Sequence, residues 1–176
     1  MIDFSRNYFE LFGLPQRFES DSASLENAYR RLQTEVHPDR FASAGEQEKR
    51  LALQSSARVN EAYRALKDPV SRAQYLLSLH GIDALSETDT QLPMDFLERQ
   101  LERREAAAQA VSANDSSALA AILGDVRREA SDLVSEVARA IDERQSFTDA
   151  RMPVRELKFM AKLANDLDAM QSSLDD

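Results

Sequence analysis

The sequence has no cysteine, and this absence excludes disulfide bonds, thiol nucleophiles and metal sites built from cysteine. Glycine (4) and proline (5) are scarce among the 176 residues, which favours long helices over turn-rich sheets. No stretch approaches the roughly 20 apolar residues of a membrane span. Residues 1–6 lack the apolar run of a signal peptide. Together these absences predict an all-α, cytoplasmic protein without a membrane partner.

The formal net charge is −9, and it is unevenly distributed along the chain. Residues 1–80 hold 11 Lys and Arg against 11 Asp and Glu, whereas residues 81–176 hold 11 against 20. Neither part has the excess of basic residues that binding to nucleic-acid phosphates requires, so we expect no nucleic-acid partner. The asymmetry indicates either two domains with different partners, the second a basic one, or a helical bundle kept soluble by acidic residues.

Two helical patterns meet at the triplet His37-Pro38-Asp39. Apolar and small residues recur there at three- and four-residue steps: Leu25, Ala28, Tyr29, Leu32 and Val36, then Ala52, Ser55, Ser56, Val59, Ala62, Tyr63 and Leu66. Pro38 ends the first helix because it restricts the preceding residue and cannot continue the hydrogen-bond ladder. The pattern predicts an antiparallel helical hairpin with His37 and Asp39 exposed at its tip.

Short helices are expected on both sides of this hairpin. Residues 7–12 form the first, and the pair Asp68-Pro69 opens the second as N-cap and first helical residue. Asp21 or Ser22 supplies the side-chain oxygen that caps the first helix of the hairpin. The N-terminal part is therefore a small helical domain.

The chain changes character after this domain. Residues 81–92 show no periodicity and several capping residues, which indicates a linker. Pro93 then opens a helix. Its predicted core face, interrupted by Arg104, consists of Met94, Leu97, Leu101, Ala108 and Val111.

Two longer amphipathic patterns follow. Their apolar positions are Leu119, Ile122, Val126, Ala130, Leu133, Val137 and Ile141, then Leu157, Met160, Ala164, Leu167, Met170 and Leu174. Turn-forming residues at 112–115 and 146–149 separate the three helices. The sequence thus predicts a helical domain at residues 1–80, a linker at 81–92 and an antiparallel three-helix bundle at 93–176.

An enzyme would use His37 as a base oriented by Asp39, or as a metal ligand. The chain offers only one other histidine, His80, and no cysteine. It also lacks a nucleophile elbow, a Gly-rich phosphate loop and paired-ligand spacing. We therefore predict no catalytic activity, no metal and no cofactor. Taken alone, the triplet favours a simple turn without function, and only its helical context changes that interpretation.

Residues 6–80 resemble the J-domain, the module by which co-chaperones engage DnaK-type chaperones. The resemblance rests on the triplet between two helical stripes and on the segments 8–14 (YFELFGL), 59–66 (VNEAYRAL) and 68–69 (DP). It implies a fold in which flanking short helices support the hairpin. It also implies a function that depends on docking.

The resemblance assigns chaperone-binding roles to the corner of the hairpin. Asp39 would accept hydrogen bonds from cationic groups near the interdomain linker of the chaperone, while Pro38 would hold the turn and His37 would orient it. Binding would favour the chaperone state in which ATP hydrolysis proceeds and substrate is trapped. Such differential binding to one conformation requires no catalytic group in this chain.

Basic residues beside the corner belong to the same implied surface. Arg30 and Arg31, on the solvent face of the second helix, would meet an acidic surface of the chaperone's ATPase domain and steer docking. Ordinary solvation is the alternative explanation for two exposed arginines. Arg40 stands where the J-domain family commonly has lysine, so the charge is kept while the hydrogen-bond geometry differs.

The C-terminal part narrows the resemblance to the HscB family, bacterial J-type co-chaperones of iron–sulfur cluster assembly. Residues 75–81 (YLLSLHG) and 96–102 (FLERQLE) are similar to that family's pattern, and the chain has no Gly/Phe-rich stretch or zinc cysteines. The resemblance implies stimulation of an HscA-like DnaK-type chaperone and delivery of an IscU-like scaffold. Lacking thiolates, the chain is not expected to bind a cluster itself.

The resemblance also implies a scaffold-binding patch on the bundle, formed by Leu97, Leu101, Glu102, Glu105 and Phe159. Periodicity alone places both leucines in the core instead, so the two interpretations conflict. Glu98 and Gln109 stand where the family often has an apolar and an acidic residue, and contacts at these two positions stay open.

Two other classes of function also stay open. The chain could be a J-domain co-chaperone for a different client, which co-purification of an iron–sulfur scaffold would distinguish. It could instead be a helical adaptor with no chaperone role, which an ATPase assay with a DnaK-type protein would distinguish.

Overall fold

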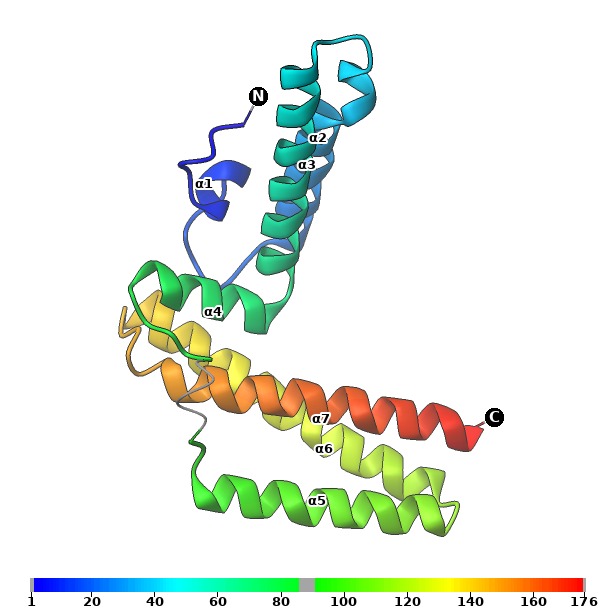
Figure 1. The fold of residues 1–176 in the computed structure, drawn as a ribbon. Helices are drawn as coiled ribbons and strands as arrows, with labels where there is room; N and C mark the ends of the chain where they lie inside the picture. The colour runs from blue at the N-terminus through cyan, green and yellow to red at the C-terminus, as the bar shows by residue number, and fades with distance from the viewer. Residues whose placement is uncertain (1, 86–90, 176) are drawn as a thin grey trace. The chain divides into compact units, whose positions relative to one another are not determined.

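The fold is known from a computed structural model, which describes residues 2–85 and 91–175. Every regular element in these residues is helical, which confirms the predicted all-α class. The chain forms two compact units, Met1–Leu79 and His80–Asp176 (Figure 1). The first unit contains α1 (Tyr8–Phe12), α2 (Ser22–Val36), the 3₁₀ turn η1 (Pro38–Phe41), α3 (Glu46–Lys67) and α4 (Pro69–Leu79).

Local sequence explains where the first helices begin and end. Asn7 and Glu10 form a capping box at the start of α1, and Gly13 ends it in the left-handed conformation, with φ of 68°. The side chain of Asp21 accepts two backbone hydrogen bonds at the start of α2, so Asp21 is the N-cap. Short polar side chains and one glycine therefore position the hairpin.

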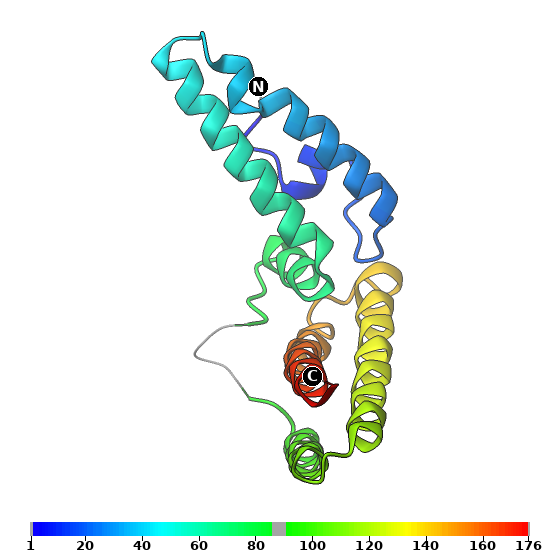
Figure 2. The ribbon, with the colours of Figure 1, turned by 90° about the vertical axis from the view of Figure 1, so that its right-hand side faces the viewer.

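Helices α2 and α3 lie side by side as the predicted antiparallel hairpin (Figures 1 and 2). Their buried facing residues are Leu25, Ala28, Leu32, Val36, Ala52, Ser55, Val59, Ala62 and Leu66. Tyr29 and Tyr63, which the pattern placed on the same faces, are half-buried at the edge of this core, with stacked rings 4.0 Å apart. The backbone N–H of Tyr8 donates to the Tyr75 hydroxyl over 2.9 Å, so α1 is tied to α4.

The second unit is the three-helix bundle that the sequence predicts. It contains α5 (Met94–Ser112), α6 (Ser116–Ala138), the π-helical turn η2 (Arg139–Glu143) and α7 (Arg151–Asp175). Helices α6 and α7 pack along each other, whereas α5 packs mainly on α6 and touches α7 less (Figure 1). Its buried core includes Phe96, Leu119, Leu123, Val126, Leu133, Val137, Leu157, Met160, Leu163 and Leu167.

The predicted linker falls partly outside the described residues, because 86–90 are among those that are not described. Before that segment, Ala84 is fully buried, and its carbonyl oxygen accepts a hydrogen bond from Arg155 Nε over 2.7 Å. Arg155 belongs to α7 and is itself buried. The hydrogen bond from Arg155 therefore holds the chain around Ala84 against α7.

The predicted core face of α5 is wrong. Met94, Leu97, Leu101 and Val111 are 71, 38, 60 and 36% exposed, and Ala108 is exposed as well. The buried residues are Phe96, Gln100, Ala107 and Ala110 instead. Periodicity identifies an apolar stripe but not whether it faces a core, and the small side chains of the alanines allow α5 to approach α6 closely on the other side.

The predicted stripe of α7 needs a smaller correction. Leu157, Met160 and Leu167 are buried as expected, but Met170 is 42% exposed. Leu163, absent from the predicted stripe, is buried. The contact between α5 and α7 is small, so the outer part of the α7 stripe has no helix covering it.

Candidate functional site

The His-Pro-Asp triplet forms a rigid corner at the end of α2. His37 follows the helix with φ of −59° and ψ of 127°, values that Pro38 favours in the residue before it. Pro38 then starts η1 with its fixed φ. The backbone N–H of Asp39 donates to His37 Nδ1 over 3.3 Å, and that of Arg40 donates to the His37 carbonyl over 3.1 Å. Local hydrogen bonds thus shape the corner, and η1 also packs against α3.

The side chains of this corner point to solvent. The Asp39 side chain is 90% exposed and that of His37 is 53% exposed, with 3.6 Å between the Asp39 carboxylate and His37 Nδ1. Arg40, by contrast, donates from its guanidinium to the Thr34 carbonyl over 3.1 Å. This bond satisfies one of the free carbonyls in the last turn of α2. Arg40 therefore supports the corner, and Asp39 is its most accessible charge.

A polar network that the sequence did not suggest braces the hairpin beside the two arginines of α2. Glu26 accepts a hydrogen bond from the Tyr63 hydroxyl over 2.5 Å and pairs with Arg30 over 3.2 Å. The hydroxyl of Tyr63 and then the guanidinium of Arg30 lower the pKa of Glu26. The Tyr29 hydroxyl donates to Asn60 over 2.9 Å. Arg30 and its neighbour Arg31 are exposed on this braced helix.

The proposed scaffold patch is exposed on α5 rather than buried. Leu97 and Leu101 are 38 and 60% exposed, and the two acidic positions, Glu102 and Glu105, are exposed beside them. Glu98 and Gln109, whose contacts the sequence left open, are exposed too. The conflict over the leucines is therefore resolved in favour of a surface position.

Phe159 of α7 lies against the same part of α5. Its ring makes an edge contact with the Phe96 ring, 5.6 Å between centroids, and the Arg104 guanidinium lies 5.5 Å above it. Because its neighbours flank it without enclosing it, Phe159 is half-buried. An aromatic ring thus lies against α5, whose two leucines and two acidic residues are exposed, and exposed apolar groups beside charged ones are typical of a protein-binding surface.

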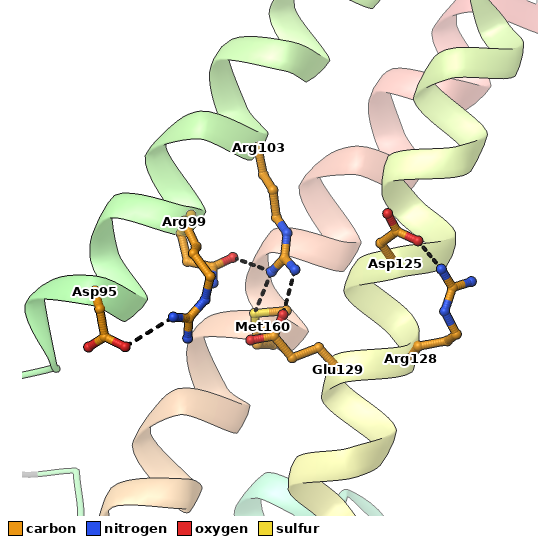
Figure 3. A network of polar contacts seen from close by, with 8 residues as sticks. Asp95, Arg99, Arg103, Asp125, Arg128, Glu129 and Met160 are labelled. Atoms are coloured by element: carbon orange, nitrogen blue, oxygen red, sulfur yellow. Dashed lines mark hydrogen bonds and ion pairs between the residues drawn. The ribbon is translucent and has the colours of Figure 1, made fainter.

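Arg103 connects the three helices of the bundle and holds α5 with this side outward (Figure 3). Its guanidinium pairs with Glu129 of α6 over 2.5 Å and donates to Gln100 Oε1 over 2.9 Å. It also lies 4.0 Å from the sulfur of Met160 in α7. The Arg103 and Glu129 side chains are only 23 and 26% exposed, so this pair is shielded from solvent.

The sequence contains a signal for this contact that the predicted pattern overlooked. Positions 96, 100, 103, 107 and 110 follow helical spacing as strictly as the leucine stripe does. Two polar residues, Gln100 and Arg103, interrupt that set, and the larger leucines therefore dominated the prediction. With Phe96 and two alanines at the other positions, this mixed stripe is the side of α5 that faces the bundle.

Replacing Arg103 with alanine should destabilise the bundle. The change leaves the Glu129 carboxylate shielded and without its cation, at a cost of about 2 kcal/mol in the free energy of unfolding. Arg99→Ala is the matched control, because Arg99 pairs over 3.0 Å with Asp95 at the surface, where such pairs contribute about 0–1 kcal/mol. Thermal denaturation compares the two variants, and equal midpoints would refute the structural role of Arg103.

Glu156 of α7 should make the stability of the bundle depend on pH. Burial, and next the nearby Glu136 carboxylate, raise the pKa of Glu156 above its ordinary value of 4.5, with Arg99 opposing. Between the unfolded pKa and the raised folded pKa, the folded state binds more protons, so this group's contribution to stability decreases as pH rises. Glu156→Gln should therefore raise the melting temperature at pH 7, with no difference below the ordinary pKa. A constant difference at all pH values would contradict the assignment.

Two features are absent from the part of the chain that the structure describes: a membrane-spanning helix and a metal-binding cluster. No helix there is long and apolar enough to cross a membrane. No three His, Asp or Glu side chains are grouped in a way that could hold a metal ion. The candidate site is thus a pair of exposed surfaces, one on each compact unit.

Comparison with protein families assigns each unit separately. Residues 7–75 match the DnaJ domain, and residues 92–168 match the HSCB C-terminal oligomerisation domain. The chain is 44% identical over 174 residues to the co-chaperone protein HscB homolog of Aromatoleum aromaticum, covering 99% of this chain and 98% of the relative. It is 41% identical to the homolog of Burkholderia vietnamiensis, covering 99% of both.

Solved structures agree with the sequence relatives. Chaperone HscB from Vibrio cholerae superimposes with a TM-score of 0.87 at 37% identity, covering 96% of this chain and 99% of that one. Human co-chaperone HscB superimposes with a TM-score of 0.88 at 30% identity, covering 96% and 83%. The agreement extends over both units, and the chain belongs to the HscB family of J-domain co-chaperones.

Proposed function

We propose that this co-chaperone stimulates the ATPase of an HscA-like, DnaK-type chaperone in the cytoplasm and delivers an IscU-like scaffold to it during iron–sulfur cluster assembly. The observation that carries the proposal is the Asp39 carboxylate, 90% exposed on a corner fixed by its own backbone bonds. A backbone that is already ordered before binding loses little conformational entropy when a partner engages the charge that it carries. It is therefore suited to docking.

On the chaperone side, Asp39 accepts hydrogen bonds from cationic groups of the partner, and Pro38 and His37 keep the carboxylate in position. Arg30 and Arg31 of α2 are exposed to solvent. In the complex they face an acidic surface of the ATPase domain. The complex stabilises the chaperone conformation that hydrolyses ATP. The acceleration comes from this preference, so the co-chaperone contributes no catalytic group.

Arg40 has a different part in this mechanism. Its hydrogen bond to the Thr34 carbonyl holds the corner against α2 in the free protein, although its charge adds to the basic surface. We therefore expect Arg40 to act mainly by positioning Asp39.

On the scaffold side, Leu97, Leu101 and Phe159 supply the apolar contact. Glu102 and Glu105 form an acidic rim that selects a partner with basic groups beside an apolar surface. The exposure of both leucines supports this assignment, because a soluble monomer normally covers its large apolar stripes. The two binding surfaces lie on separate units, so each partner has a surface of its own.

The proposal is tested by measuring single-turnover ATP hydrolysis by a DnaK-type chaperone with and without this protein, and by calorimetric titration with the scaffold. We expect faster hydrolysis and saturable scaffold binding. Faster hydrolysis without scaffold binding would indicate a J-domain co-chaperone for a different client. Absence of both effects would leave a helical adaptor and overturn the proposal.

A further inference from the structure

The exposed apolar stripe of α5 is longer than the scaffold patch. Exposed Met94 and Val111 mark its two ends, and the helix rises about 25 Å from one to the other at 1.5 Å per residue. The patch on α5 extends only from Leu97 to Glu105. The C-terminal half of the helix, which includes exposed Ala108, therefore has no role in the proposed function.

A groove lies beside this unused half, between α5 and α7. It has a volume of about 480 Å³ and is lined by Arg104, Ala107, Leu163, Asp166, Met170 and Ser173, among others. Met170, 42% exposed, is the large apolar side chain available to a ligand there. The groove exists because α5 and α7 make little contact with each other.

The groove continues the scaffold patch rather than forming a separate site. Arg104 lines the groove, and its guanidinium also covers the ring of Phe159, a residue of the patch. A protein bound to the patch therefore reaches the entrance of the groove. The patch has only five residues, whereas a specific interface usually involves about 20–30 residues on each side. The scaffold must contact neighbouring surface, and the groove is contiguous with the patch.

The charge of the groove indicates the kind of segment it accepts. Residues 163–175 of α7 contain three aspartates and no lysine or arginine. Asp168 is paired with Arg127 over 2.7 Å, whereas Asp166 lines the groove. The free carbonyl groups in the last turn of α7 add partial negative charge. This arrangement favours a bound segment with a basic residue next to an apolar one. Arg104 repels positive charge, so the basic residue of that segment would lie on the Asp166 side.

We infer that the scaffold places a second segment in this groove, with an apolar side chain against Met170 and a lysine or arginine near Asp166. This inference rests on the proposed scaffold-binding function. It enlarges the binding surface to the C-terminal halves of α5 and α7. It also assigns a role to Met170, which the sequence had placed in the bundle core.

The inference is tested by calorimetric titration of the IscU-like scaffold into the full-length protein and its variants. Met170→Ala should weaken binding roughly three- to tenfold, the effect of removing part of one apolar contact. Met170→Lys should weaken it further through repulsion of the basic segment. Asp166→Asn should reduce the dependence of the affinity on salt concentration. Leu53→Ala, 60% exposed on α3, is the control expected to bind normally.

Leu101→Ala, measured in the same series, separates failure of this inference from failure of the proposed function. If Leu101→Ala weakens binding while the Met170 and Asp166 variants bind normally, the groove is not part of the interface and the inference is wrong. If Leu101→Ala also binds normally, the scaffold patch itself is wrong. Because Met170 and Asp166 are both exposed, their variants should fold, and circular dichroism checks this.

Discussion

Asp39→Ala is expected to abolish stimulation of the chaperone ATPase while leaving the fold of the co-chaperone unchanged. The side chain is 90% exposed, and the bond that Asp39 makes to His37 Nδ1 comes from its backbone N–H, which alanine retains. The substitution therefore affects only the complex, because the cationic groups of the chaperone lose a carboxylate acceptor. Losing one or two charge-assisted hydrogen bonds weakens docking roughly tenfold to hundredfold, so stimulation is lost at limiting co-chaperone concentration.

Three further variants sharpen this measurement. Asp39→Asn keeps the shape and removes the charge, so it should be nearly as defective as alanine. His37→Gln should also abolish stimulation, because it replaces the imidazole nitrogen that accepts from the Asp39 backbone N–H with a longer, flexible side chain. Asp132→Ala, an exposed carboxylate on α6, is the control that should stimulate normally. Loss of helicity in the Asp39 or His37 variants would contradict the separation of docking from folding.

Leu97→Ala combined with Phe159→Ala should weaken scaffold binding by more than thirtyfold, without changing basal ATPase stimulation. Residues at the centre of an interface commonly contribute about 2 kcal/mol or more each, and both side chains belong to the apolar part of the proposed patch. The effect on stimulation should be absent because the substitutions lie in the second unit, whereas the chaperone contacts lie in the first.

The control for the double variant must distinguish loss of a binding contact from loss of bundle stability. Phe159 contacts Phe96, which is buried, so Phe159→Ala also removes some packing from the bundle. Leu101→Ala avoids this problem, since Leu101 is 60% exposed, and it should still weaken binding. Leu53, also 60% exposed, provides a matched leucine on the J-domain. Equal scaffold affinity for the Leu101 and Leu53 variants would argue against the patch.

Sequence reasoning is most accurate where local chemistry determines the structure. The Asp21 cap and the restriction that Pro38 imposes both act within a few residues, so the hairpin and its corner could be predicted. The stripes of α2 and α3 also pack as predicted, because each has one dominant apolar face.

Helix α5 shows where the same reasoning fails. It has two stripes of similar regularity, and the one with leucines is exposed while the one with Phe96, Gln100 and two alanines is buried. Hydrophobic periodicity measures the amphipathic character of a helix but does not identify what covers the apolar side. In this chain the error is informative, because a strongly apolar face left in solvent is the basis of the proposed scaffold surface.

Contacts between residues far apart in the sequence could not be predicted either. The Arg103–Glu129 pair and the hydrogen bond from Tyr63 to Glu26 join residues on different helices, and nothing in the spacing along the sequence indicates them. Each lies beside one of the two proposed binding surfaces. Their side chains are ordinary helix-surface residues by composition, so only the packing of the helices reveals their role.

The most direct test of the account measures steady-state ATP hydrolysis by the HscA-like chaperone while this protein is added, with and without the IscU-like scaffold. The account predicts that hydrolysis accelerates with increasing co-chaperone, and that the scaffold increases the effect because both surfaces then act together. A rate that stays at its basal value in both titrations would contradict it.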